Sequence, residues 1–212
     1  MESLPYRNNA NIKTDEMRLH YRIYRAVLVV ASTILNKAVM RAAGVKYGRG
    51  FRSCGRVMIR NYASGGGIFV GENLNINSGL IANPVAGVGR MVLFAGQGGK
   101  IIIGNNASFS NCVLFSEECI TIGDEACIGA GCKIYDTDFH SVNPEYRLNG
   151  NTKVPTAPVT IGKRVFLGAN VTVLKGVTIG DEAVVGAGSI VTHDIPAREI
   201  WAGSPAKFIR KL

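Results

Sequence analysis

Residues 161–196 read IGKRVF LGANVT VLKGVT IGDEAV VGAGSI VTHDIP when they are cut into blocks of six. Every block opens with Ile, Leu or Val, and four of the six blocks have Gly in second place. An α-helix repeats about every 3.6 residues and a plain strand about every 2, so neither explains this period. A short strand followed by a tight corner explains a period of six residues. The stretch therefore predicts a coiled chain whose sides are strands and whose opening aliphatic side chains point inward.

Three such blocks return the chain to its starting side and make one triangular turn. Successive turns then stack at the spacing of paired strands, about 4.8 Å. The same register appears upstream at Ile122, Ile128 and Ile134, and looser copies open at Val70, Ile76 and Ile103. A stack of coils exposes an edge at each end, and each end needs a cap. The N-terminal segment and the C-terminal tail are the candidates for these caps.

We therefore predict a mainly β protein in three parts. Residues 1–45 form an amphipathic helical segment, residues 46–196 form a parallel β-helix of hexapeptide repeats, and residues 197–212 form a C-terminal tail or short helix. The length of 212 residues suits one sizeable domain. The apolar share of 47% excludes a disordered chain, and the 26 glycines indicate many tight turns.

The net charge of +9 leaves three partners open: nucleic acid, an anionic membrane surface, or a small polyanionic ligand such as a phosphorylated cofactor. The chain has no nucleic-acid-binding motif, and its aromatic residues are not interleaved with basic ones, so we expect no nucleic-acid partner. The five cysteines are odd in number and form no CxxC pair. They are predicted to be buried, reduced residues, not a disulfide framework or a zinc site.

Residues 14–43 are predicted to be a helix with Thr14 as N-cap and Gly44 as the stop after its C-terminus. One apolar stripe follows the helical period: Leu19, Ile23, Val27, Val30, Ile34 and Ala38. The stripe either packs on the main domain or another subunit, or it contacts lipid at a membrane periphery. The best apolar run, Ala26 to Leu35, has ten residues and predicts no membrane span. With no secretory signal, a cytoplasmic protein is expected.

One long interruption breaks the register, because Ile161 follows Ile134 by 27 positions. The surplus predicts an extended loop over residues 135–160, and long loops on rigid scaffolds commonly carry function. This loop contains His140. Asp136, Asp138 and Glu145 lie near it in sequence and could orient its ring.

The repeats, the loop with its His and the closing stretch IPAREIWAGSPAKFIR, residues 195–210, together resemble the hexapeptide-repeat O-acetyltransferases. The likeness is greatest to the maltose, galactoside and polysaccharide O-acetyltransferase group. It implies a left-handed parallel β-helix and a homotrimer with active sites between subunits. It also implies transfer of acetyl from acetyl-CoA to a hydroxyl of a sugar or polysaccharide precursor, with no metal.

The resemblance further implies roles for individual residues. His140 would be the general base that deprotonates the acceptor hydroxyl, which suits imidazole at neutral pH. Asn111 and Glu117 would bind the acceptor, although Asn111 also fits a plain corner residue. The expected contacts with acetyl-CoA are Ala169, Ala187, Thr192 and His193 along the pantetheine arm and Lys207 and Arg210 near the phosphates.

Three other classes stay open. A xenobiotic acetyltransferase of the antibiotic-modifying type shares the loop His. A metal enzyme of the γ carbonic anhydrase type needs three His ligands, and only His140 and His193 lie in or beside the coils. A non-catalytic β-helix that binds a partner would use the basic charge and the amphipathic helix alone.

Overall fold

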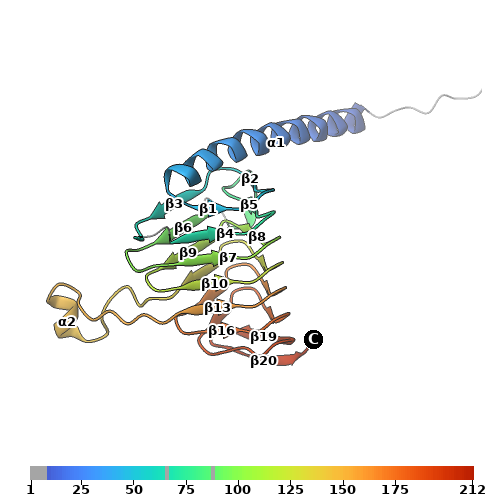
Figure 1. Cartoon of the computed structure of the whole chain (residues 1–212). Helices are drawn as coiled ribbons and strands as arrows, with labels where there is room; N and C mark the ends of the chain where they lie inside the picture. The colour runs from blue at the N-terminus through green and yellow to red at the C-terminus, as the bar shows by residue number, and fades with distance from the viewer. Residues whose placement is uncertain (1–8, 65–66, 87–88) are drawn as a thin grey trace, which may run out of the picture.

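The computed structural model describes residues 9–64, 67–86 and 89–212; residues 1–8 of the expected N-terminal segment lie outside the described residues. One long helix, α1 (Asn9–Ala42), lies across one end of a stack of short strands (Figure 1). A single loop with a short helix, α2 (Pro144–Leu148), projects from the side of the stack. The C-terminus lies at the end opposite α1 (Figure 1).

The strands form three sheets, one on each side of a triangular coil. The first sheet has the order β1 (Lys46–Tyr47), β4 (Ile68–Val70), β7 (Ile101–Ile103), β10 (Ile120–Ile122), β13 (Val159–Ile161) and β16 (Thr178–Ile179). The second has the order β2 (Arg52–Cys54), β5 (Asn75–Asn77), β8 (Ser108–Ser110), β11 (Cys127–Ile128), β14 (Phe166–Leu167), β17 (Val184–Val185), β19 (Glu199–Gly203) and β20 (Ala206–Lys211). The third has the order β3 (Met58–Asn61), β6 (Val92–Ala95), β9 (Val113–Ser116), β12 (Lys133–Tyr135), β15 (Thr172–Val173) and β18 (Ile190–Val191).

The chain visits the three sheets in turn, so each third strand returns to the same side. Neighbouring coils pair in parallel with equivalent residues in register, as in Ile122 with Ile103 on one side and Ile161 on the other. The six opening aliphatic residues of the repeat are all nearly inaccessible to solvent: Ile161, Leu167, Val173, Ile179, Val185 and Val191. Their stacked side chains form the core, which confirms the predicted left-handed parallel β-helix.

Glycine in second place of the repeat allows the coils to approach closely at the corners. A Cβ added to Gly162 would lie 2.7 Å from the backbone nitrogen of Asp181 in the next coil. One added to Gly123 would lie equally close to the backbone of Gly162. The glycines of the motif are therefore required by stacking, since any side chain there would push the coils apart.

α1 caps the first coil with polar side chains. The edge strand β2 has no coil beyond it, so its backbone groups need partners. Asn36 donates to Ser53 Oγ and the Gly55 carbonyl and accepts from Val57 N, and Ser32 Oγ accepts from Gly55 N. Helix capping of this end is thus confirmed, and it operates through hydrogen bonds as much as through apolar contact.

The apolar stripe of α1 does not pack on the coils. The interpretation that the stripe packs on the main domain is therefore wrong for the single chain. Val27, Val30 and Ile34 are 61%, 60% and 66% exposed. The face that meets the coils is instead the one with Ser32, Asn36 and Met40. The edge strand beneath α1 requires hydrogen bonds, and polar residues of the helix provide them, so the apolar stripe is left for one of the other two alternatives, a second subunit or lipid.

The C-terminal limit of α1 is as predicted, and its start is not. Gly44 has φ +67, its N–H donates to Arg41 O, and Val45 N–H donates to Met40 O. This is the double hydrogen bond of a helix that ends at a glycine in the left-handed region. Thr14 is not the N-cap, because the helix already includes Asn9.

The C-terminal tail is a β-hairpin and not a helix. β19 continues the second sheet beside β17, and β20 turns back antiparallel to β19. Trp201 and Phe208 meet edge to face at 6.5 Å between ring centroids, so the tail packs on the last coil as expected.

The cysteines only partly follow the expectation that all are buried. Cys54, Cys112 and Cys132 are buried, whereas Cys119 is half-buried and Cys127 is exposed. Cys127 directly precedes the inward-pointing Ile128, and successive side chains of a strand point to opposite faces. All five are free thiols.

Candidate active site

The projecting loop leaves the coil after β12 and returns at β13, so it spans residues 136–158. The root of the loop, where the chain leaves β12, is held in place by Asp136, which is fully buried. The Asp136 carboxylate accepts hydrogen bonds from Ser116 Oγ at 2.6 Å, Glu117 N at 2.8 Å and Glu118 N at 3.0 Å. A carboxylate that collects three donors from the neighbouring coil fixes where the loop departs.

His140 lies on the exposed part of this loop, and Asn151 fixes the chain around it. The Asn151 side chain accepts from Ser141 N at 3.0 Å and donates to Phe139 O at 2.9 Å. It therefore clamps the residues on both sides of His140. Within the described residues the imidazole of His140 makes no hydrogen bond, and its backbone N–H donates to Asp138 O.

The carboxylates expected to orient His140 are used elsewhere. Asp136 holds the loop root, and Asp138 forms an ion pair with Lys175 at 3.0 Å. Glu145 lies in the first turn of α2, where Asn143 provides the N-cap. The prediction that one of them orients the ring is wrong for this chain alone. The amide of Asn151 instead holds the backbone on both sides of His140, a contact that no sequence pattern indicates.

A hollow of about 500 Å³ opens beside the loop root. Its lining includes Phe115, Glu117, Thr137, Phe139 and Asn151. Glu117 also borders a second hollow, of about 470 Å³, with Tyr62, Phe94, Gly96 and Gln97. Glu117 thus lies between two hollows, next to the residue that precedes His140 in sequence. His140 is not among the lining residues of either hollow; its neighbour Phe139 lines the first together with Glu117.

An aromatic ladder leads to these hollows along the outer face of the third sheet. Tyr62 meets Phe94 at 5.6 Å, and Phe94 stacks on Phe115 at 4.1 Å with nearly parallel rings. Phe115 and Tyr135 both meet Phe139 edge to face, at 4.8 and 5.0 Å. Sequence analysis missed this ladder. The available signal was the equivalent register of Phe94, Phe115 and Tyr135 in successive coils.

The side chain of Asn111 holds a neighbouring corner of the coil through hydrogen bonds. It is buried, with φ 50, and its amide donates to Asn83 O and accepts from Gly79 N. Both polar atoms of its side chain are therefore used within the chain. This geometry favours the corner role that the sequence analysis kept as the alternative to acceptor binding.

The residues predicted to line the pantetheine arm occupy two corners of the coil. Ala169 and Ala187 stack at the corner between the second and third sheets, where the Gly188 N–H donates to Ala169 O. Thr192 and His193 follow β18 at the next corner and hydrogen-bond to each other at 2.8 Å. That second corner is also the one from which the loop departs after β12.

Lys207 and Arg210 lie on β20, opposite Ala202 and Ile200 of β19, and both are exposed. They are two to three coils beyond the loop root, at the end of the stack that lacks α1 (Figure 1). Among the described residues, no group of three or more His, Cys, Asp or Glu side chains is placed to hold a metal ion.

Glu117 allows a pH-dependent prediction. Burial raises its pKa above the ordinary value of 4.5, and the nearby Asp136 carboxylate raises it further. A raised pKa means that the folded chain favours the neutral form, so this contribution to stability is present below pH 4.5 and is lost as pH rises through the folded-state pKa. Glu117→Gln should therefore melt at a higher temperature than the wild type at pH 7.

The check is a series of thermal melts from about pH 3.5 to pH 8. The difference between Glu117→Gln and the wild type should shrink toward zero below about pH 4. Glu118→Gln, at the exposed neighbouring residue, is the matched control. Equal melting temperatures for Glu117→Gln and the wild type at every pH would show that the carboxylate is not destabilised in its hollow.

The repeat itself matches a known family model. Residues 158–193 match the model described as the hexapeptide repeat of succinyl-transferase. The chain carries this hexapeptide repeat over residues 158–193. The chain is 40% identical over 122 residues to the galactoside O-acetyltransferase of Escherichia coli, an alignment that covers 57% of the chain and 58% of the relative. It thus spans little more than half the length of that relative. The resemblance drawn from the sequence is confirmed.

Solved structures share the fold of this chain. A hexapeptide-repeat acetyltransferase from Vibrio cholerae, solved with acetyl coenzyme A, has a TM-score of 0.57 at 20% identity and covers 100% of this chain and 93% of its own. AntD, an N-acyltransferase from Bacillus cereus solved with dTDP and 3-hydroxybutyryl-CoA, has a TM-score of 0.64 at 22% identity. That match covers 82% of this chain and 87% of AntD.

Proposed function

We propose that this chain is an acetyl-CoA-dependent O-acetyltransferase that acetylates a hydroxyl of a sugar or polysaccharide precursor. The observation that carries the proposal is the placement of His140. Its imidazole projects from a loop that Asp136 and Asn151 hold in place, and no hydrogen bond within the described residues occupies the ring. An unengaged imidazole on a rigid support is suited to general-base chemistry near neutral pH.

The proposed reaction is direct transfer within a ternary complex. The imidazole of His140 removes the proton of the acceptor hydroxyl as that oxygen attacks the thioester carbonyl carbon. The tetrahedral intermediate collapses, the carbon–sulfur bond breaks, and the thiolate of CoA takes up the proton that the imidazole holds. Acetyl passes to the acceptor oxygen, and no acetylated enzyme forms.

A sugar-type acceptor fits the hollow beside the loop root. The faces of Phe94 and Phe115 offer a flat apolar surface for a sugar ring, and Glu117 offers a carboxylate to its hydroxyls. Further support comes from the names of two similar proteins. The Escherichia coli relative is a galactoside O-acetyltransferase, and AntD was solved with a sugar nucleotide, dTDP-4-amino-4,6-dideoxyglucose.

We also propose a homotrimer with each active site between two subunits. In one protomer Thr192 and His193 lie at the corner from which the loop of His140 departs, whereas Ala169 and Ala187 lie at the corner between the second and third sheets. A neighbouring subunit would close the corner at the loop into a cleft. Exclusion of water from such a cleft protects the thioester from hydrolysis and strengthens the hydrogen bonds of the transition state.

The proposal is tested by release of free thiol from acetyl-CoA with a panel of sugars, sugar nucleotides and aminoglycoside-type antibiotics as acceptors. We expect thiol release that depends on a sugar hydroxyl and a product whose acetyl group is lost in mild base, as an ester is. Release that depends only on an antibiotic would favour the xenobiotic class. Binding of CoA without any acceptor-dependent release would favour a non-catalytic protein.

Lys207 and Arg210 provide a test of the cofactor assignment. If they contact the CoA phosphates, the double variant Lys207→Ala/Arg210→Ala should raise the KM for acetyl-CoA about tenfold with little change in kcat, because two exposed charge contacts contribute about 1 kcal/mol or less each. Arg49→Ala, at an exposed arginine near the other end of the stack, is the matched control. An unchanged KM in the double variant would remove both residues from the cofactor site.

A further inference from the structure

α1 leaves an apolar face uncovered along most of its length. The side chains of Leu19, Ile23, Val27, Val30 and Ile34 are each more than half exposed. With about 100° between successive helical residues, they lie on the side opposite Ser32, Asn36 and Met40, which contact the coils. Tyr24, Leu35, Ala31 and Ala38 widen the same face. An apolar face of this extent on a described surface indicates a partner.

The uncovered face is also the outermost surface of its end of the molecule. α1 lies across the end of the stack, and all coils lie on its other side (Figure 1). A flat partner can therefore meet the face along the whole helix without touching the coils. By length and composition, residues Arg18–Ala42, with a hydropathy of 1.4, could even cross a membrane.

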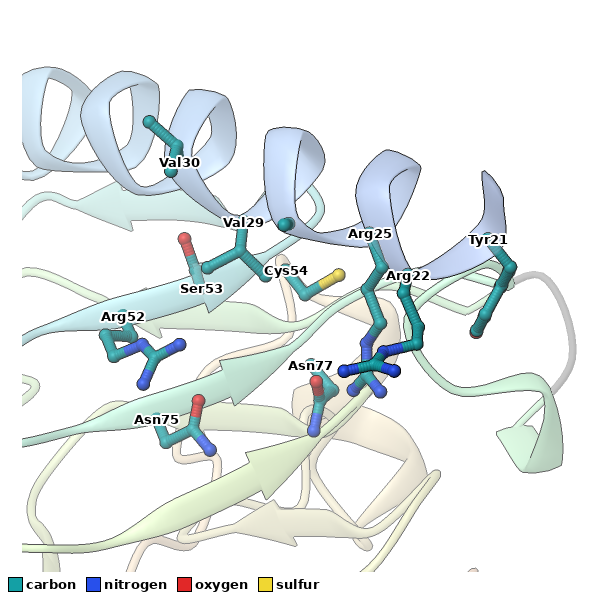
Figure 2. A pocket seen from close by; sticks show the side chains of 11 residues that line it. Tyr21, Arg22, Arg25, Val29, Val30, Arg52, Ser53, Cys54, Asn75 and Asn77 are labelled. Atoms are coloured by element: carbon teal, nitrogen blue, oxygen red, sulfur yellow. The ribbon is translucent and has the colours of Figure 1, made fainter. Parts of the chain in front are cut away.

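The charge of this segment is entirely positive. Residues 18–42 contain five basic residues and His20 but no Asp or Glu, although the chain has 15 acidic residues in all. Arg22 and Arg25 extend from α1 into a hollow of about 520 Å³ beneath the helix, where Arg52, Asn75 and Asn77 also lie (Figure 2). None of the residues lining this hollow is acidic.

The three arginines of this hollow have no partner within the described chain. Arg22, Arg25 and Arg52 form no ion pair with a described residue, and their guanidinium groups donate no hydrogen bond there. Guanidinium groups bind phosphate well, and this hollow offers three of them with no acidic residue in its lining. The hollow is therefore suited to phosphate groups.

We propose that α1 docks the protein onto an anionic lipid bilayer. The apolar face of α1 enters the headgroup boundary, and the positive charge of the segment, including Arg22 and Arg25 on the opposite, coil-facing side of the helix, attracts the anionic surface. The combination of a fully basic segment and an apolar face at the end of the molecule is the complement of an anionic membrane surface. This docking is independent of the proposed acetyl transfer.

The packing of α1 distinguishes docking from spanning. Ser32, Thr33 and Asn36 bind the backbone or side chains of the segment from Ser53 to Val57. A helix that crosses the bilayer would leave that edge strand without these partners and would bury the same polar side chains in lipid. A helix that lies in the interface keeps every one of these hydrogen bonds.

A second copy of the chain is a weaker match for the same face. Two α1 helices packed through their apolar faces would bury Val27 and Ile34, but the helix contributes no carboxylate to Arg22 or Arg25 of either copy. The arginine hollow would stay without an anion. A bilayer covers the apolar face, and its anionic surface attracts the basic segment.

The test is co-sedimentation of the full-length protein with vesicles of phosphatidylcholine alone or with phosphatidylglycerol added. We expect at least tenfold stronger partitioning to the anionic vesicles, weakened by salt, since each basic residue near such a surface contributes about fivefold. Val27→Ser/Ile34→Ser should reduce binding to anionic vesicles at least tenfold. Arg22→Gln/Arg25→Gln should reduce it similarly and flatten the salt dependence.

The matched control is Val142→Ser/Leu148→Ser, at two apolar side chains of the projecting loop that are 76% and 83% exposed. It should bind vesicles like the wild type, and circular dichroism should show all variants folded. The proposal is overturned if the protein partitions equally to both vesicle types or binds neither of them. It is also overturned if Val27→Ser/Ile34→Ser abolishes self-association in solution without affecting vesicles, or if alkaline carbonate fails to release bound protein, as for a spanning helix.

Discussion

Replacement of His140 by Ala is expected to lower kcat for acetyl transfer by about 10²–10⁴-fold, the usual contribution of a general base. Among the carboxylates of the projecting loop, Asp136 and Asp138 are used by the loop itself, and Glu145 lies in the first turn of α2, away from the clamped segment around His140. The substitution removes an exposed side chain, so the fold and the affinity for acetyl-CoA should be retained. Steady-state thiol release and equilibrium binding of CoA together measure the two effects.

His20→Ala is the matched control for His140→Ala, because it removes an exposed His from α1 at the end of the stack. We expect wild-type kcat in this variant. The kcat of Asn151→Ala should lie between those of His140→Ala and His20→Ala. Loss of the Asn151 clamp leaves the imidazole of His140 present but less well placed. Turnover by His140→Ala close to that of the wild type would rule out the assigned mechanism.

The second large effect is expected at Asp136. Asp136→Ala removes the buried acceptor of Glu117 N and Glu118 N, whereas Ser116 Oγ keeps Lys100 O as an acceptor. Each buried donor that loses its partner costs about 1–3 kcal/mol, so we expect the free energy of unfolding to fall by about 2 kcal/mol or more. The root of the loop should also loosen and turnover should fall with it.

Urea denaturation at pH 7 measures the effect of Asp136→Ala, with Asp138→Ala as the matched control. Asp138 makes a partly exposed ion pair with Lys175, so its loss should cost less than about 1 kcal/mol. Asp136→Asn keeps one acceptor oxygen and should lie between the two. If Asp136→Ala and Asp138→Ala unfold at the same urea concentration, Asp136 does not anchor the loop.

The β-helix could be predicted from sequence because its rule is local and repeated. Each hexapeptide places one aliphatic residue inward and one small residue at the corner. Equivalent positions such as Ile122 and Ile161 then stack on each other, and the six-residue period alone is enough to predict this. The extended loop was predictable for the same reason: chain beyond the two blocks that complete a coil has to leave the stack. The position of His140 on that loop also follows from the register, because the residue lies in the stretch of chain that leaves the stack.

What sequence could not predict depends on pairing between distant residues. The amide of Asn151 reaches back to the chain around His140, and Asn111 is occupied by Gly79 and Asn83, both through contacts that no periodicity encodes. The orientation of α1 is a third case. Its apolar stripe was visible, but which face meets the coils depends on the unpaired edge strand β2, and that strand is known only from the fold.

The most direct test of the account is a crystal structure of this protein with CoA bound, in which one distance is measured. The distance joins the sulfur of CoA to the nearer imidazole nitrogen of His140. A base that contacts the acceptor hydroxyl, which in turn contacts the thioester, predicts about 6 Å or less, with the sulfur in a cleft between two subunits. A sulfur bound far from every His140, or an imidazole turned away from the cleft, would contradict the account.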